Sequence, residues 1–211
     1  MRAAVLFLNG KINLSFCEDY IIKHCKALPI YCADGAYNKV FRSDQLSHNI
    51  LAIIGDKDSF SGIKAPSTEY ELIKDQESSD FDKSLNFLYE KGYQKIIVFG
   101  AGGIEMDHYL GNVSSILHFQ TKLYIILVDD YSYSFVLNKN MSINNIKDQR
   151  ISIIPLFMLD RLTLQGCQYQ LDEEILKFGS RIGIRNSAVS NEVKINYHRG
   201  QGLIFISHNK F

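Results

Sequence analysis

The sequence predicts an α/β fold, in which a doubly wound, mostly parallel sheet forms the N-terminal domain and an all-β sandwich forms the C-terminal domain. Up to about residue 130, short continuous apolar runs alternate with helix-like segments, as in parallel strands joined by crossover helices. Beyond residue 130, short runs alternate polar with apolar residues and are separated by Asn, Gly and Asp turns. We therefore expect two domains, residues 1–130 and residues 131–211.

The first half divides into elements by its apolar periodicity. Buried strands are expected where the runs are short and continuously apolar, and an edge strand is expected where polar and apolar residues alternate. The strands are predicted at 3–8, 28–33, 49–55, 68–75 (the edge strand), 95–100 and 122–130. Helices are predicted at 15–27, briefly after residue 34, and at 80–91 and 107–119.

Capping residues support two of these helices. Ser15 followed by Glu18 predicts a capping box for the first helix. Ser79 precedes the helix at 80–91 as its N-cap, and Gly92 follows as its C′ residue. We therefore expect the chain to enter the third helix at a fixed point directly after residue 79.

The second half is read as strands throughout. The expected runs are "YSFVL", "MSIN", "RISIIPLF", "RLTLQGCQYQL", "SRIGIR", "EVKINYH" and "GLIFISH". The segment "DEEILKF" at 172–178 is the exception, because it could form a helical turn or two.

Composition excludes several classes of function. The 211 residues carry 23 basic and 23 acidic side chains, without the basic excess typical of nucleic-acid binders. No apolar run approaches the length of a membrane helix. The cysteines at 17, 25, 32 and 167 form no CxxC pair and fit no zinc template. We expect free, reduced thiols and a cytoplasmic location.

Four aspartates follow the ends of separate apolar runs: Asp34, Asp56, Asp58 and Asp80. The carboxyl ends of parallel strands share one edge of a sheet, where ligands bind. Carboxylates gathered there can hold Mg²⁺ against phosphate oxygens. Each residue taken alone has a structural alternative: a helix N-cap for Asp34, turn stabilisation for Asp56 and Asp58, and a surface ion pair between Asp80 and Lys83.

A glycine-rich segment, "FGAGGIEMDHYLGN" at 99–112, follows a predicted strand and opens a predicted helix. Gly102 and Gly103 could expose backbone N–H groups to phosphates. The segment is neither a G-x-G-x-x-G fingerprint nor a Walker A sequence. As structural alternatives, Asp107 and His108 could be helix caps and Asn112 an interior polar group.

Taken in order, these segments resemble the thiamin pyrophosphokinase family. The resemblance spans nearly the whole chain and rests on "ADGAYN" (33–38), "GDKDS" (55–59), "DQESSDFDKSL" (75–85), "GAGGIEMDHYLGN" (100–112), "SNEV" (190–193) and "GLIF" (202–205). It implies an ATP- and Mg²⁺-binding catalytic domain at 1–130 and a thiamine-binding, dimerisation β-sandwich at 131–211. It also implies a homodimer with active sites between subunits, and transfer of diphosphate from ATP to the hydroxyl group of thiamine with release of AMP.

The resemblance also implies roles for individual residues. The magnesium-binding acids would be Asp34, Asp56, Asp58 and Asp80. The catalytic set would be Asp56, Asp58, Asp80 and Lys83, with Lys83 steadying the ATP phosphates and Asp80 or Asp56 accepting the hydroxyl proton. Nucleotide contacts would come from Asp34, Lys83, Gly102, Gly103, Asp107 and Asn112. Thiamine contacts would come from Gln76, Ser190 and Asn191.

Two departures from the family pattern bear on nucleotide binding. Where the family has Gly-Arg before its acid–His pair, the matching stretch of this chain is Ile104-Glu105-Met106. Lys57 stands where an aromatic residue is common. Replacing an arginine by Glu105 removes a phosphate contact and adds repulsion, which Arg181, Arg185 or a lysine of a partner subunit could offset. The alternative function is therefore a non-catalytic thiamine- or nucleotide-binding regulatory protein of the same fold.

Overall fold

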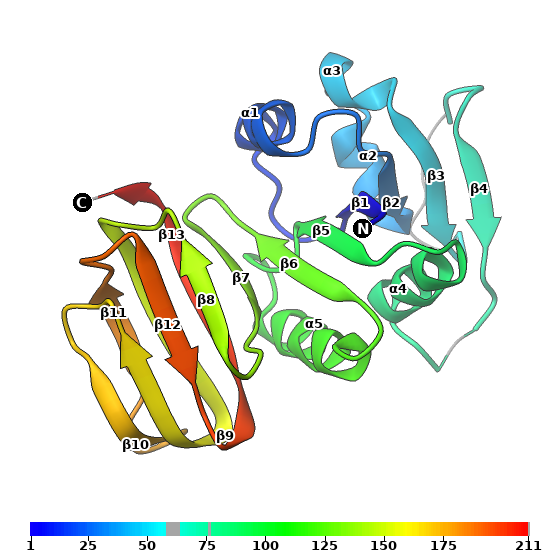
Figure 1. Ribbon diagram of the computed structural model, residues 1–211. Helices are drawn as coiled ribbons and strands as arrows, with labels where there is room; N and C mark the ends of the chain where they lie inside the picture. The colour runs from blue at the N-terminus through cyan, green and yellow to red at the C-terminus, as the bar shows by residue number, and fades with distance from the viewer. Residues whose placement is uncertain (58–63, 76, 211) are drawn as a thin grey trace. The chain divides into compact units, whose positions relative to one another are not determined.

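A computed structural model describes residues 1–57, 64–75 and 77–210 of the chain (Figure 1). The chain divides into two compact units, Met1–Asp130 and Tyr131–Phe211. This division coincides with the change in sequence pattern near residue 130. Each unit is described by itself below.

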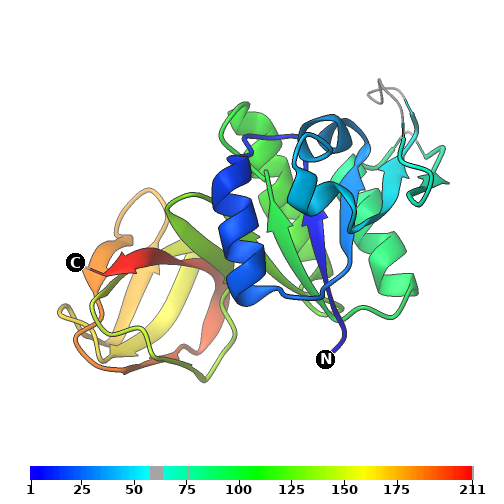
Figure 2. The ribbon, with the colours of Figure 1, turned by 90° about the horizontal axis from the view of Figure 1, so that it is seen from above.

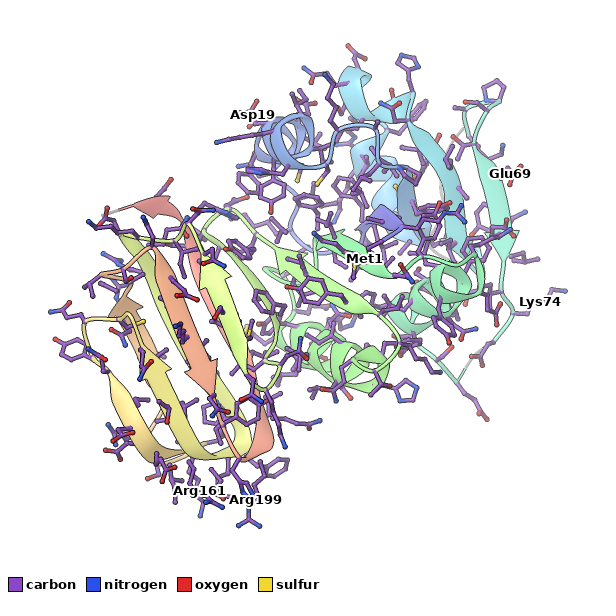
Figure 3. All side chains as sticks on the ribbon, viewed as in Figure 1. Met1, Asp19, Glu69, Lys74, Arg161 and Arg199 are labelled. Carbon is purple, nitrogen blue, oxygen red and sulfur yellow. The ribbon has the colours of Figure 1, made fainter. Side chains whose placement is uncertain are left out.

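Unit 1 is built on a parallel sheet that has six strands within the described residues. The strand order is β4-β3-β2-β1-β5-β6. The strands are β1 (Ala3–Phe7), β2 (Ile30–Ala33), β3 (Ile50–Gly55), β4 (Glu69–Leu72), β5 (Lys95–Phe99) and β6 (Tyr124–Val128). β4 is the edge strand, as predicted, and Figure 3 labels the exposed residues Glu69 at its start and Lys74 just beyond its end.

The helices of unit 1 lie on both faces of this sheet. They are α1 (Leu14–His24), η1 (Asp34–Ala36), α2 (Tyr37–Val40), α3 (Asp44–Ser47), α4 (Asp80–Glu90) and α5 (Met106–Phe119). Figure 1 shows α1 on one face and α4 and α5 on the other, and Figure 2 shows α1 in front of the strands. The chain builds outward from β1 in one direction, then returns to build β5 and β6 in the other. Right-handed crossovers therefore place the two sets of helices on opposite faces.

The core of unit 1 explains why its strands are continuously apolar. In register, Val5 of β1 lies between Ile30 of β2 and Ile97 of β5. Both faces of these strands are covered, so neither face has polar positions. Phe7 and Phe99 are fully buried, and their rings stack with centroids 5.1 Å apart.

The predicted cap of the first helix was wrong by two residues. The N-cap of α1 is Asn13, whose side-chain oxygen accepts a hydrogen bond from the Phe16 backbone N–H. Ser15 lies inside the first turn and donates its hydroxyl hydrogen to Asn13 Oδ1 at 3.0 Å. Asn and Ser are about equally favourable as N-cap residues, so the local sequence did not indicate which of Asn13 and Ser15 would cap the helix.

The caps of the third predicted helix are confirmed. Ser79 Oγ accepts from the Asp82 backbone N–H at 3.1 Å and so caps α4. Gly92 adopts φ +81° after the last turn, a conformation in which glycine has no Cβ to clash. This start of α4 fixes the positions of Asp80 and Lys83.

Within the described residues, unit 2 consists of strands joined by turns. They are β7 (Ser132–Val136), β8 (Met141–Asn144), β9 (Gln149–Gln165), β10 (Leu171–Lys177), β11 (Gly183–Ser187), β12 (Glu192–Asn196) and β13 (Arg199–Lys210). β13 pairs antiparallel with both β7 and β9, while β12 pairs with β8 and β9. The all-β character is as predicted, and the sandwich arrangement stays a prediction.

Two segments of unit 2 that were predicted as separate strands form one continuous strand. "RISIIPLF" and the start of "RLTLQGCQYQL" are joined in the 17-residue β9, which also pairs with β10 and β11. Phe157 and Arg161 have positive φ values of 72° and 50°, so the strand changes direction there without ending. Figure 3 labels Arg161 together with Arg199, whose register partner on β9 is the neighbouring Asp160.

The helical alternative for 172–178 was wrong. Residues 172–177 belong to β10, which pairs antiparallel with the second half of β9, and Phe178 follows in a turn. The register shifts on both sides of Glu174, and Glu173 has φ +50°. The helix propensity of the two glutamates is overridden by backbone pairing to a neighbouring strand.

All four cysteines are free and buried, as expected. Among the described residues, none of the helices is long and apolar enough to cross a membrane.

Candidate active site

A cavity of about 660 Å³ opens where the strand order of unit 1 reverses, between β1 and β5. Its walls include the turn after β1 (8–10) and the turn after β5 (100–102). Asp56, Asp80 and Lys83 also line it. Ligands of open α/β sheets bind at this kind of reversal, outside the carboxyl ends of the strands.

Glycines let the two turns pack against each other. The Gly10 N–H donates to the Gly100 carbonyl at 2.9 Å, and the Lys11 N–H donates to the Gly102 carbonyl at 2.8 Å. A Cβ on Gly10 would stand 2.3 Å from the Gly100 oxygen, so no larger residue fits. The glycine-rich segment thus has a packing role. The contacts of Gly102 and Gly103 with nucleotide stay a prediction.

Lys83 forms ion pairs with two aspartates that line the cavity. Its Nζ lies 3.0 Å from Asp56 Oδ2 and 3.2 Å from Asp80 Oδ1. The Lys83 side chain is 4% exposed and that of Asp56 12%, whereas that of Asp80 is 38% exposed. Burial alone would lower the pKa of Lys83, but its hydrogen bonds to Asp56 and Asp80 outweigh burial and raise it. The sequence prediction that Asp80 and Lys83 share a helix face is confirmed.

Asp34 lies behind the wall of this cavity. It is fully buried at the first residue of η1, and the Tyr70 hydroxyl donates to its Oδ1 at 2.7 Å. A Cβ on Gly55 would stand 2.7 Å from the Asp34 Cβ, which packs this side chain against the end of β3. Burial and the bond to Asp34 raise the pKa of Tyr70 above its ordinary value. The N-cap position of η1 is Ala33, so the capping alternative for Asp34 was wrong.

The start of α5 carries the departure from the family pattern. Glu105 occupies the N-cap position without a side-chain capping bond, which corrects the alternative that Asp107 or His108 caps this helix. Glu105 Oε2 lies 3.3 Å from His108 Nε2, and both side chains are largely exposed. The Asp107 Oδ1 accepts from the His108 backbone N–H at 3.0 Å.

Asn112 joins α5 to the glycine-rich turn. Its Nδ2 donates to the Ala101 carbonyl at 2.7 Å, and the residue also lines the cavity. The interior polar role considered for Asn112 is therefore present. A nucleotide contact from the same residue stays a prediction.

A second cavity, of about 860 Å³, adjoins the first. The two cavities share Ser78, Ser79, Lys83, His108 and Asn112. Four acidic residues line the second cavity: Asp75, Glu77, Asp82 and Asp107. Asp107 is thus placed on this second cavity and is not among the residues that line the first.

Six predicted site residues are not among those that line either cavity, and two of them, Asp34 and Gly103, belong to the described part of unit 1. Asp58 and Gln76 lie outside the described residues. Ser190 and Asn191 lie between β11 and β12 of unit 2, where both are exposed. Ser190 Oγ accepts from the Glu192 N–H at 3.4 Å, and the Asn191 carbonyl accepts from Asn145. Their contacts with thiamine stay predictions.

The two arginines considered as replacements for the missing family arginine also belong to unit 2. Arg181 pairs with Glu174 at 2.9 Å. Arg185 lies in β11, where its backbone N–H donates to Ser152 Oγ.

The donor chemistry of the first cavity fits a hard cation. Asp56 and Asp80 present carboxylate oxygens to one point, and an ammonium group already stands between them. Carboxylates with space for water and phosphate oxygens are the ligands that Mg²⁺ prefers. Among the residues that the structure describes, no group of three or more His, Cys, Asp and Glu side chains is assembled for a metal. The four-aspartate set, which includes Asp58, stays a prediction.

Sequence reasoning missed three residues that line the first cavity: Asn9, Gly10 and Lys39. Asn9 and Gly10 directly follow the first apolar run, so the strand-end rule that selected the aspartates could also have found them. Lys39 carries no comparable signal, because its place depends on contacts with a segment thirty residues earlier.

Two protein-family models match the chain. Residues 21–127 match the family model described as "Thiamin pyrophosphokinase, catalytic domain". Residues 136–201 match "Thiamin pyrophosphokinase, vitamin B1 binding domain".

Individual relatives and solved structures agree as well. Thiamine pyrophosphokinase 1 of Oryza sativa subsp. japonica is 27% identical over 197 residues, covering 78% of this chain and 73% of the relative. The crystal structure of thiamine pyrophosphokinase from Bacillus subtilis has a TM-score of 0.82 at 20% identity, covering 97% of this chain and 98% of the other. That of Candida albicans thiamin pyrophosphokinase has a TM-score of 0.81 at 17% identity, covering 99% and 89%. With both family models matched in order along the chain, this chain belongs to the thiamin pyrophosphokinase family.

Proposed function

We propose that the chain is a thiamine diphosphokinase, which transfers diphosphate from ATP to the hydroxyl group of thiamine and releases AMP. The observation that carries the proposal is the buried Lys83, held between Asp56 and Asp80 in a cavity at the reversal of the sheet. Family membership and the relatives' names support the same reaction.

The reaction needs positioning more than covalent chemistry. Charge gathers on phosphate oxygens in the transition state, and preorganised cations at that point stabilise it. Lys83 is preorganised because two carboxylates fix its Nζ before substrate arrives. Asp80 or Asp56 would accept the proton of the attacking hydroxyl group, and Asp80 is the more exposed of the two.

Asp34, Asp56, Asp58 and Asp80 would hold Mg²⁺. When bound, the ion would neutralise phosphate charge and orient ATP. Asp56 and Asp80 have the further task of keeping Lys83 charged in a buried place, since their hydrogen bonds raise its pKa.

Unit 2 would supply the thiamine contacts and a homodimer interface. Large apolar side chains are exposed on this unit: Phe157, Tyr169, Ile175, Phe178, Ile184 and Val189. We infer that some of these groups gather at the dimer interface, since contiguous exposed apolar surface is typical of surfaces that bind another protein. Sedimentation equilibrium should give twice the 24.1 kDa of one chain. The reduced, buried thiols support a cytoplasmic location.

An assay with ATP, Mg²⁺ and thiamine tests the proposed reaction directly. We expect AMP and thiamine diphosphate as products in equal amounts. ADP as the product would identify an ordinary kinase. Binding of thiamine without any product would favour the regulatory alternative, for which the exposed Glu105 at the mouth of the first cavity is the supporting observation.

Asp58→Asn tests the metal site, because the amide keeps the shape of the side chain but loses its charge. We expect turnover to fall by more than about 100-fold with the fold intact. Asp19→Asn, on the exposed face of α1, is the matched control and should retain full turnover. An Asp58→Asn enzyme with wild-type turnover would remove this residue from the site.

A further inference from the structure

The basic side chains of the first cavity are unequally available to a ligand. Among the described residues that line it, the basic side chains are Lys39, Lys83 and His108. Lys83 is paired with two aspartates, and His108 lies beside Glu105. Lys39 alone of these has no carboxylate partner within the described part of the chain, since its hydrogen bonds go to main-chain carbonyls.

Lys39 is held in a defined place. Its Nζ donates to the Asn9 carbonyl at 2.6 Å and to the Gly10 carbonyl at 3.0 Å, at the end of β1. A lysine ammonium has three N–H donors, so these bonds account for two of them. Lys39 lies in the four-residue helix α2, and the cavity is lined by Lys39 together with both of its carbonyl partners.

The electrostatics of this corner favour an anion. Partial burial lowers the pKa of Lys39, in keeping with an ammonium whose described partners are neutral carbonyls. An anionic group beside the ammonium would replace the lost water with a charge-assisted hydrogen bond. The site also lies at the reversal of the sheet, where phosphate groups of nucleotides are bound in open α/β folds.

We propose that Lys39 is a binding residue for the polyphosphate chain of ATP, contacting phosphate oxygens from the β1 side of the cavity while Lys83 does so from the α4 side. This inference deepens the proposed function and rests on it only in taking ATP as the ligand. Lys39 supplies the unneutralised positive charge, whereas Lys83 enters the site already balanced by two carboxylates.

Binding measurements in the presence of Mg²⁺ test this role without thiamine turnover. Isothermal titration of Lys39→Met should give a Kd for ATP, and for inorganic tripolyphosphate, at least about tenfold above wild type. The Kd for adenosine should not change, because adenosine carries no phosphate. Lys39→Arg should recover most of the ATP affinity.

A second variant separates charge from polarity. Lys39→Gln keeps an N–H donor on a side chain one bond shorter but has no charge, so it should lose ATP affinity as Lys39→Met does. Lys23→Met, on the exposed last turn of α1, removes the same charge elsewhere and should bind ATP normally. Circular dichroism would verify the fold of each variant.

Two results would overturn the assignment. One is wild-type ATP affinity in Lys39→Gln. The other is an equal loss of adenosine and ATP binding in both uncharged variants, which would make Lys39 a structural clamp. A wild-type chain that binds ATP through Lys39 yet forms no thiamine diphosphate would refute the proposed reaction and leave the role of Lys39 standing.

Discussion

Replacing Lys83 by methionine would expose the charge balance on which the candidate site depends. Methionine keeps much of the apolar stem but removes the ammonium that lies 3.0 Å from Asp56 and 3.2 Å from Asp80. The two carboxylates would then lose the ammonium that they share, and Asp56 is only 12% exposed. The change therefore acts on a buried pair rather than on a surface ion pair.

The expected loss of stability follows from the two contacts taken separately. Removing one partner of a buried ion pair costs about 3–5 kcal/mol. The contact with Asp80 adds at most about 1 kcal/mol, because that carboxylate is more than one-third exposed and solvent screens it. Asp56 can regain some hydration in the variant, so we expect a net loss of about 3 kcal/mol. For a chain of this length, that corresponds to a fall in Tm of roughly 6–12 °C.

Thermal unfolding followed by far-ultraviolet circular dichroism is the suitable assay, since the chain has no tryptophan. Each protein would be melted with and without millimolar Mg²⁺. If the two carboxylates form a cation site, Mg²⁺ should raise the Tm of Lys83→Met more than that of wild type. Lys74→Met, an exposed lysine beyond β4, is the control and should melt like wild type. Wild-type stability in Lys83→Met, or equal stabilisation of both proteins by Mg²⁺, would refute this reasoning.

Four further predictions concern the packing around the site and the buried thiols. Gly10→Ala should lower Tm and weaken ATP binding together, because its Cβ would stand 2.3 Å from the Gly100 oxygen; unchanged melting and affinity would contradict the packing role. Tyr70→Phe removes the hydroxyl that donates to buried Asp34 and should cost about 1–3 kcal/mol in urea unfolding, whereas a neutral effect would show that this bond is dispensable. The thiols should not react with a thiol reagent in the native state and should all react in denaturant, because burial raises their pKa values, to about 12 for Cys17 and about 11 for Cys25 and Cys167. The same raised pKa values predict how the free energy of unfolding depends on pH. The thiols of the unfolded chain ionise from about pH 9.0 and those of the folded chain only at higher pH, so the stability contributed by the buried neutral thiols should decline as pH rises from 9.0 through the folded-state pKa values. A constant free energy of unfolding over that range would contradict this prediction.

The parallel half of the fold could be predicted because its sequence signals are local and consistent. Each strand is a short apolar run, and Ser79 and Gly92 mark the two ends of α4. The convergence of Asp56, Asp80 and Lys83 followed from topology, since parallel strands bring their carboxyl ends to one edge.

The remaining features depend on contacts between distant segments. Lys39 is positioned by carbonyls near residue 10, and the residues next to it in the sequence do not predict that contact. The left-handed conformation at Phe157 and Arg161 occurs in residues that rarely adopt it, so the join within β9 had no local signature. Likewise, residues 171–177 form the strand β10 because they pair with β9, which is a contact that their own sequence does not predict.

The pairing of β13 also orders events during synthesis. Residue 207 pairs with residue 132, and residue 203 pairs with both 136 and 154. β7 and the first half of β9 therefore cannot pair with β13 until that strand has been synthesised, some fifty to seventy residues later. Pairings of such long range form slowly and leave strand edges open meanwhile. Unit 1, whose strands all precede residue 130, can complete its sheet while unit 2 is still being translated. A nascent chain stalled before β13 would thus carry a complete parallel sheet in unit 1, whereas β7 and the edge of β9 that pairs with β13 would lack that partner and be prone to aggregation.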